Sequence, residues 1–119
     1  MARQHLARRL VCLPTAIALG REVPVATGLR ARLLGLAGLD RDEAGGGLLI
    51  PCCASVHTFG MRFALDLHFL DERGRERSVR RDVGPRRVVS DRRAVAVLEL
   101  PSGTVRGPIG GQRGPARGR

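Results

Sequence analysis

The residues best suited to acid–base or nucleophilic chemistry lie in the middle of the chain: His57, the acids Asp66 and Glu99, and the adjacent Cys52 and Cys53. Histidine changes charge near neutral pH, so His57 could act as a general base if Asp66 or Glu99 oriented its ring. Cys53 lies four residues before His57 and suggests a Cys–His pair only weakly. Structural roles are simpler for all of them, because buried acids and loop histidines need partners regardless of chemistry.

The common catalytic and metal-binding motifs are absent from the sequence. No serine stands in a Gly-x-Ser-x-Gly nucleophile motif, and the three glycines at 45–47 are not followed by the Lys-Ser/Thr of a phosphate-binding loop. The acids at 40, 42 and 43 lack calcium-loop spacing, and Cys52, Cys53, His57 and His68 match no zinc spacing. The sequence therefore predicts no metal and no cofactor.

The cysteine count and the N-terminus bear on the compartment. Three cysteines make an odd number, which does not suit a secreted disulfide framework, so a reduced, cytoplasmic protein is expected. Residues 10–19 follow two arginines and imitate a signal peptide, although Pro14 interrupts this short apolar run and it could equally be a strand. No run reaches the 18 or so apolar residues of a membrane span.

Most of the elements that must position these residues read as short strands. Strands are expected at 10–13, 22–26, 48–50, 64–70, 75–83, 86–90 and 94–100. Thr27 is a plausible N-cap for one amphipathic helix whose apolar stripe is Leu29, Leu33 and Leu36. The acidic, Gly-rich segment 40–47 reads as a loop.

Three of these strands have a predictable place in a sheet. In 64–70, Leu65, Leu67 and Phe69 share one face while Asp66 and His68 share the other. The 71–74 turn leads into 75–83, which is charged enough to be an edge strand. The 94–100 strand is apolar on both faces apart from Glu99, which is typical of a central strand.

The length and the turn spacing indicate a mainly β fold. A chain of 119 residues, 43% of them apolar, fits one domain. About seven short strands with turns every 8–12 residues favour a β-sandwich or distorted barrel carrying one short amphipathic helix. The expected organisation is a basic extension at 1–9, the β-sandwich domain at 10–105 and a flexible Arg/Gly/Pro-rich tail at 106–119.

The net charge of +10 suggests nucleic-acid binding at first sight. All 21 basic residues are arginine, a bias that a GC-rich genome is sufficient to cause. Seven of the ten excess charges lie in residues 1–9 and 106–119, and the aromatics Phe59, Phe63 and Phe69 cluster away from them. Specific nucleic-acid recognition is therefore not expected, and nonspecific attraction of polyanions to the arginine-rich tails remains an alternative.

Four motifs in register carry a family resemblance. They are RLLGL at 32–36, HTFGM at 57–61, LD at 65–66 followed by FLD and Gly74, and VLEL at 97–100 followed by Gly103. The series resembles domain-of-unknown-function family 192, a set of small bacterial and archaeal proteins, from about residue 23 to 103. The resemblance implies a compact β-sandwich and no established reaction. Gly60 stands where members usually carry an aromatic, and the closing helix and Gly-Asp turn of the family have no counterpart after Val105.

Two functional hypotheses follow, both built on the same candidate residues. The first is a non-catalytic module that binds a small ligand or a protein partner in a shallow pocket lined by Arg32, His57, Met61, Asp66 and Glu99. The second is a small hydrolase or isomerase that uses a His–carboxylate pair. The distances among these side chains discriminate between the two hypotheses.

Overall fold

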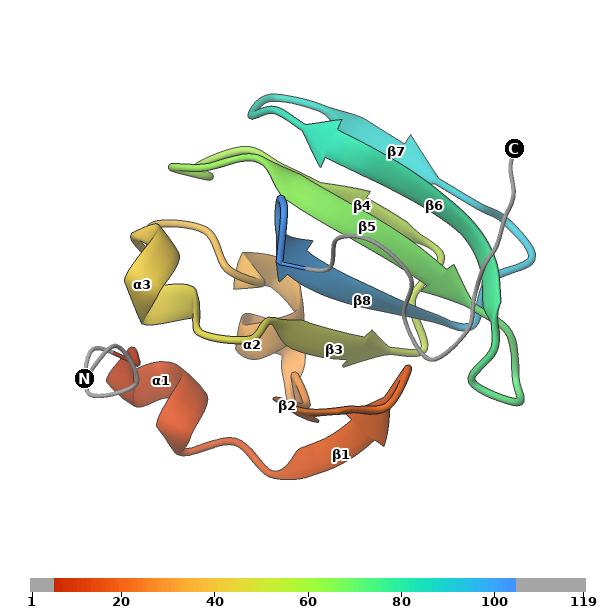
Figure 1. Cartoon of the computed structure of the whole chain (residues 1–119), viewed down its shortest axis with the longest axis horizontal. Coiled ribbons are helices and arrows are strands. Elements are labelled where there is room, and N and C mark those ends of the chain that lie inside the picture. Colours follow the sequence, from red (N-terminus) through yellow and green to blue (C-terminus); the bar gives the residue numbers. More distant parts are fainter. Residues whose placement is uncertain (1–5, 105–119) are drawn as a thin grey trace.

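The computed structural model describes residues 6–104, in which eight short strands and three short helices form a mainly β domain (Figure 1). The helices are α1 (Arg8–Val11), α2 (Leu29–Leu34) and α3 (Arg41–Ala44). The strands are β1 (Thr15–Ala18), β2 (Arg21–Pro24), β3 (Leu48–Pro51), β4 (Ser55–His57), β5 (Leu65–Leu70), β6 (Glu76–Val83), β7 (Val88–Ser90) and β8 (Ala96–Pro101).

A four-stranded antiparallel sheet in the order β3-β8-β5-β6 forms the centre of the molecule. β1 pairs with β2 in one hairpin, and β4 pairs with β7 in a separate two-stranded ribbon. Figure 1 shows the three helices on one side of the molecule, with β6 and β7 at its opposite end. In the described part of the chain the sheets do not close into a barrel.

The two faces of the central sheet carry separate apolar clusters. Leu65, Leu67 and Phe69 of β5 belong to the larger cluster, together with residues of α1, α3 and the β4–β7 ribbon; we call this the helix-side face. Leu70 lies on the other face, the hairpin-side face, which the β1–β2 hairpin covers. Side chains alternate between the faces along each strand, so register decides which side of the sheet a polar group occupies.

The predictions for the central strands are confirmed. β5 alternates as expected, β6 is an edge strand, and β8 lies between β3 and β5 with nearly every residue buried. The turn at 71–74 closes the β5–β6 hairpin, where the N–H of Gly74 donates to the carbonyl of Asp71 at 2.9 Å. Two strands, β1 and β4, had no predicted counterpart.

Two segments predicted as strand or loop are helical. Residues 10–13 were expected to be extended, but α1 ends at Val11 and buries only Leu10 against the larger core, and Pro14 follows. The expected loop at 40–47 contains α3, which begins with a capping box in which the backbone N–H of Asp40 donates to Glu43 Oε1 at 2.8 Å. Capping satisfies amide groups that a four-residue helix would otherwise leave unpaired.

The predicted apolar stripe of α2 is also wrong. Leu29 is 71% exposed and Leu33 is 60% exposed, so only Leu36, beyond the helix, is buried. The inward-facing residues are instead Ala31 and Leu34, which lie three positions apart. Thr27 is not the N-cap, because Gly28 holds that position with a φ of 86°.

The predicted domain boundaries lie at the two ends of the described chain. The first helix runs across the expected boundary at residue 9, and Leu6 and Ala7 pack against the core. The expected tail at 106–119 lies outside the described residues. Among residues 6–104, no helix has the length and apolar character that crossing a membrane requires.

Candidate functional site

The central sheet separates the two acids that the sequence placed in one pocket. In the β5–β8 pairing Asp66 lies opposite Leu100, whereas Glu99 lies opposite Leu67. Asp66 therefore belongs to the hairpin-side face and Glu99 to the helix-side face. The pocket expected from Arg32, His57, Met61, Asp66 and Glu99 together is not formed, because a buried sheet divides it.

Asp66 serves as a buried acceptor for backbone and side-chain donors. Its carboxylate accepts the N–H of Asp82 at 2.9 Å, and Arg81 Nη1 and the N–H of Gly103 at 3.4 Å each. These contacts connect the end of β6 and the segment after β8 to the start of β5. The carboxylate thus links β5, β6 and the segment after β8 through hydrogen bonds, which is a structural role.

Replacing Asp66 with Asn is expected to lower the free energy of unfolding by about 2 kcal/mol, because the amide cannot satisfy all these donors. Denaturant unfolding measures the loss. The matched control is Asp42→Asn at an exposed position, expected to change stability by less than about 0.5 kcal/mol. Equal effects of the two substitutions would show that Asp66 does not hold these segments.

Glu99 is the most unusual titratable group in the described chain. Glu99 is 3% exposed, and its Oε1 atom has no hydrogen-bond partner in residues 6–104. Burial raises the pKa of Glu99 to about 7, and a hydrogen bond from the backbone N–H of Leu36 acts in the opposite direction. The carboxyl lies against Gly35, where a Cβ atom would come within 2.8 Å of Oε1.

Two of the predicted site residues, Arg32 and Glu99, act electrostatically on Cys53. Burial raises the pKa of the Cys53 thiol, a hydrogen bond with the backbone of Ser55 lowers it, and the charge of Glu99 raises it while that of Arg32 lowers it. The guanidinium of Arg32 donates to the carbonyl of Cys52 at 2.8 Å. A thiol with a raised pKa is a poor nucleophile at neutral pH, so this cluster does not favour cysteine catalysis.

His57 and Met61 lie at and just after β4, and neither forms a hydrogen bond with Asp66 or Glu99 within residues 6–104. The Nδ1 atom of the His57 ring accepts a hydrogen bond from the backbone N–H of Phe59 at 3.2 Å. Met61 is a core residue. Because His57 is exposed while Asp66 and Glu99 are both buried, the geometry gives no support to a general base formed by His57 with either acid.

The His–carboxylate pair that does exist joins His68 and Glu76. Their Nδ1 and Oε1 atoms are 2.7 Å apart, and the hydrogen bond to His68 is the main reason that the pKa of Glu76 is lowered. Both residues lie in the β5–β6 hairpin. The turn predicted at 71–74 was therefore the feature of the sequence that could have indicated their proximity. The other ring nitrogen of His68 is buried without a partner in residues 6–104, so no substrate can reach it. No group of three or more ligating side chains occurs in the same residues.

A small apolar pocket between α1 and α2 was not predicted from the sequence. It encloses about 90 Å³, and its apolar lining consists of Leu10, Leu13, Ala31, Leu34 and Leu48. Gly35, which lies against Glu99, completes the wall.

Two cations also line this pocket. Arg9 donates to the carbonyls of Gly35 and Ala37 at 3.1 and 2.6 Å, so its guanidinium is fixed. Burial lowers the pKa of Arg9, the charge of Arg30 lowers it further, and the charge of Glu43 acts in the opposite direction. Arg30 has no salt bridge within the described chain, so two arginines of like charge line one apolar pocket.

Comparison with solved structures shows the fold. The crystal structure of a "putative transcription regulator" from Sinorhizobium meliloti 1021 matches with a TM-score of 0.61 and 22% identity, covering 76% of this chain and 78% of that one. A protein of unknown function from Novosphingobium aromaticivorans DSM 12444 matches with a TM-score of 0.55 and 16% identity, covering 82% and 87%. No curated protein matches the chain.

The sequence match is to one family. The model of domain-of-unknown-function family 192 (DUF192), described as "Uncharacterized ACR", matches residues 15–108. This range contains all four motifs from which the resemblance was drawn, and it covers most of the chain. The chain therefore belongs to the DUF192 family.

Proposed function

We propose that the protein is a cytoplasmic, non-catalytic module that binds a small organic acid in the pocket between α1 and α2. The observation that supports this most is the pairing of an apolar cavity with two arginines of like charge. An anion placed between Arg9 and Arg30 would relieve their repulsion, and a guanidinium binds a carboxylate through two parallel hydrogen bonds. The three free cysteines at 12, 52 and 53 support a reducing compartment.

The size of the cavity limits the ligand. An apolar cavity of about 150 Å³ accommodates benzene, so one of about 90 Å³ suits a chain of a few carbon atoms. Short-chain monocarboxylic acids combine such a chain with one carboxylate. Larger cofactors need cavities of about 300 Å³ or more.

The test is an NMR titration of the full chain with acetate, propionate, butyrate, hexanoate and the neutral analogue 1-butanol. We expect saturable shifts of the Ala31 and Gly35 amides, with tightest binding at about three to five carbons. Arg30→Gln should weaken butyrate binding about tenfold, which corresponds to one lost charge-assisted contact. Arg80→Gln, which removes an exposed arginine of β6, is the matched control.

Three results would overturn the proposal. One is equal binding of butyrate and 1-butanol, which would show that the arginines do not recognise the carboxylate. The second is equal weakening by Arg30→Gln and Arg80→Gln. The third is no saturable shift with any acid of the series.

A further inference from the structure

The charge of the described chain is concentrated at one end of the fold. Residues 73–93, which span β6 and β7, contain nine arginines and three acids, whereas residues 6–72 contain seven of each. All nine arginines are exposed. Genome composition acts on the whole chain and does not explain this concentration.

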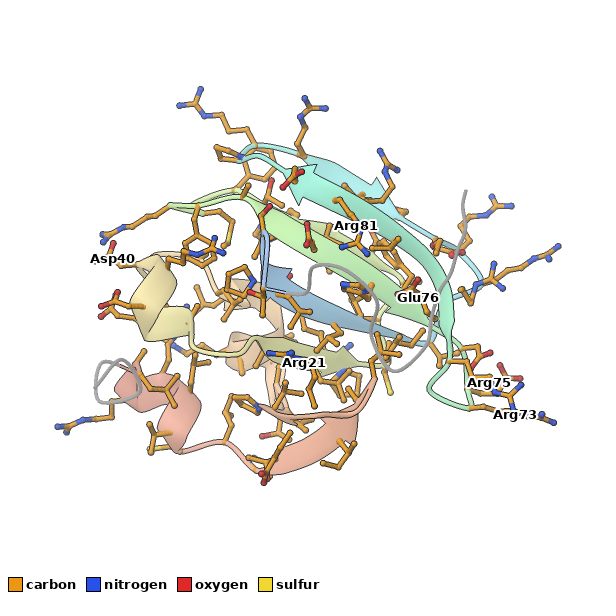
Figure 2. The ribbon with its side chains drawn as sticks, in the orientation of Figure 1. Arg21, Asp40, Arg73, Arg75, Glu76 and Arg81 are labelled. Carbon is orange, nitrogen blue, oxygen red and sulfur yellow. The ribbon has the colours of Figure 1, made fainter. Side chains whose placement is uncertain are left out.

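Few of these arginines are used within the fold. Arg77 pairs with Asp91 at 3.2 Å and Arg81 with Asp66 at 3.4 Å. The other seven form no salt bridge within residues 6–104: Arg73, Arg75, Arg80, Arg86, Arg87, Arg92 and Arg93. Figure 2 shows Arg73 and Arg75 extending outward from the tip of the β5–β6 hairpin, whereas Arg81 lies over the sheet.

An exposed aromatic residue follows Thr58, which bonds to the backbone of two of the unpaired arginines. Phe59 is 52% exposed, and its ring centroid is 5.7 Å from that of His57. Thr58, the residue before it, bonds to the backbone of Arg86 and Arg87 through three hydrogen bonds. The N–H of Arg86 donates to the Thr58 carbonyl at 3.3 Å, the N–H of Thr58 to the Arg87 carbonyl at 2.8 Å, and the N–H of Arg87 to Thr58 Oγ1 at 2.9 Å.

The backbone at Arg86 is held in a conformation that favours glycine. Its φ is +64°, and it follows Pro85 in the order that a type II turn requires, where glycine is the usual residue. An arginine in the left-handed region costs about 1–2 kcal/mol relative to glycine. Strain of this kind at a non-glycine residue is enriched at functional sites; Leu19, Cys52 and Asp82 are the other non-glycine residues of the described chain with a positive φ.

We propose that Phe59, Arg86 and Arg87 form a binding site for single-stranded nucleic acid. Bases stack on the Phe59 ring, and the two guanidinium groups contact the flanking phosphates. A single strand fits better than a duplex, because a ring can stack only on a base whose face is free. The hydrogen bonds of Thr58, just beyond the β4–β7 pairing, connect an aromatic and two arginines that are far apart in the sequence, and this site is separate from the α1–α2 pocket.

The test is fluorescence anisotropy of a labelled oligo(dT) of about 12 nucleotides with the full chain, at salt concentrations from about 50 to 200 mM. Phe59→Ala should weaken binding at least about fivefold across this range, since stacking depends less on salt than phosphate contacts do. Phe59→Tyr keeps a ring and should bind like the wild type. Each of Arg86→Gln and Arg87→Gln should reduce the slope of log K against log salt by about 0.7.

The matched control is the double variant Arg8→Gln/Leu33→Ala, which removes one exposed arginine and one exposed apolar side chain elsewhere. It leaves Phe59, Arg86 and Arg87 unchanged, so it should bind oligo(dT) within about twofold of the wild type. The proposal is overturned if this control weakens binding as much as Phe59→Ala does, or if Phe59→Tyr loses binding as well. It is also overturned if a duplex of equal length, or vesicles of phosphatidylglycerol, bind more tightly than oligo(dT).

Discussion

Replacing Glu99 with Gln will change the stability of the protein, relative to the wild type, by about 2–3 kcal/mol more favourably at pH 8 than at pH 5. Burial raises the pKa of Glu99 from its ordinary value of 4.5 to about 7. Between these two values the folded chain keeps a proton that the unfolded chain releases. The contribution of Glu99 to stability is therefore complete below pH 4.5, declines as pH rises to about 7 and stays lost above it.

Glutamine keeps the size of the side chain and an acceptor for the Leu36 N–H, but it cannot ionise. Denaturant unfolding of both proteins at pH 5, 6, 7 and 8 measures the difference in the free energy of unfolding. Glu72→Gln, at an exposed acid of the hairpin turn, should show no such growth with pH. A difference that stays constant from pH 5 to 8 would contradict the raised pKa.

Replacing Gly47 with Ala will cost at least about 3 kcal/mol, because two penalties add. The φ of Gly47 is +117°, which residues with a Cβ atom rarely adopt. A Cβ atom there would lie 2.5 Å from the carbonyl oxygen of Glu99 and would also overlap Leu100 Cδ2. The first of these is a backbone atom of the central strand and cannot turn aside.

Gly74→Ala separates the two penalties in the same unfolding experiment. Gly74 has a φ of +77°, but no heavy atom lies within 4 Å of the position of an added Cβ. This substitution should cost only about 1 kcal/mol, from backbone strain alone. If both variants lose the same stability, the close approach of residue 47 to β8 is not energetically important.

The central sheet was predictable because its strands carry their own pattern. The alternation around Asp66 and the apolar run around Glu99 arise from local burial on one or two faces, and both strands form where expected. The short helices were not predictable in the same way. Four residues in α1 contain one buried side chain, so no periodicity exists to be read.

The grouping of the candidate residues failed for a different reason. The sequence identified Asp66 and Glu99 as acids within strands, and both are buried, but only the register of β5 against β8 places them on opposite faces. The contacts of Glu99 with Gly35 and its effect on Cys53 come from segments distant in the sequence. Long-range pairings of this kind leave no trace in local spacing.

The described domain is electrostatically uneven, because residues 73–93 carry nine arginines and three acids while residues 6–72 carry seven of each. In Figure 1, β6 and β7 lie at the end of the molecule opposite α1, which lines the pocket. Any anionic surface or polymer will therefore orient the domain before contact, with β6 and β7 leading. The pocket then faces away into solvent, so an anchored molecule can still exchange its small ligand freely.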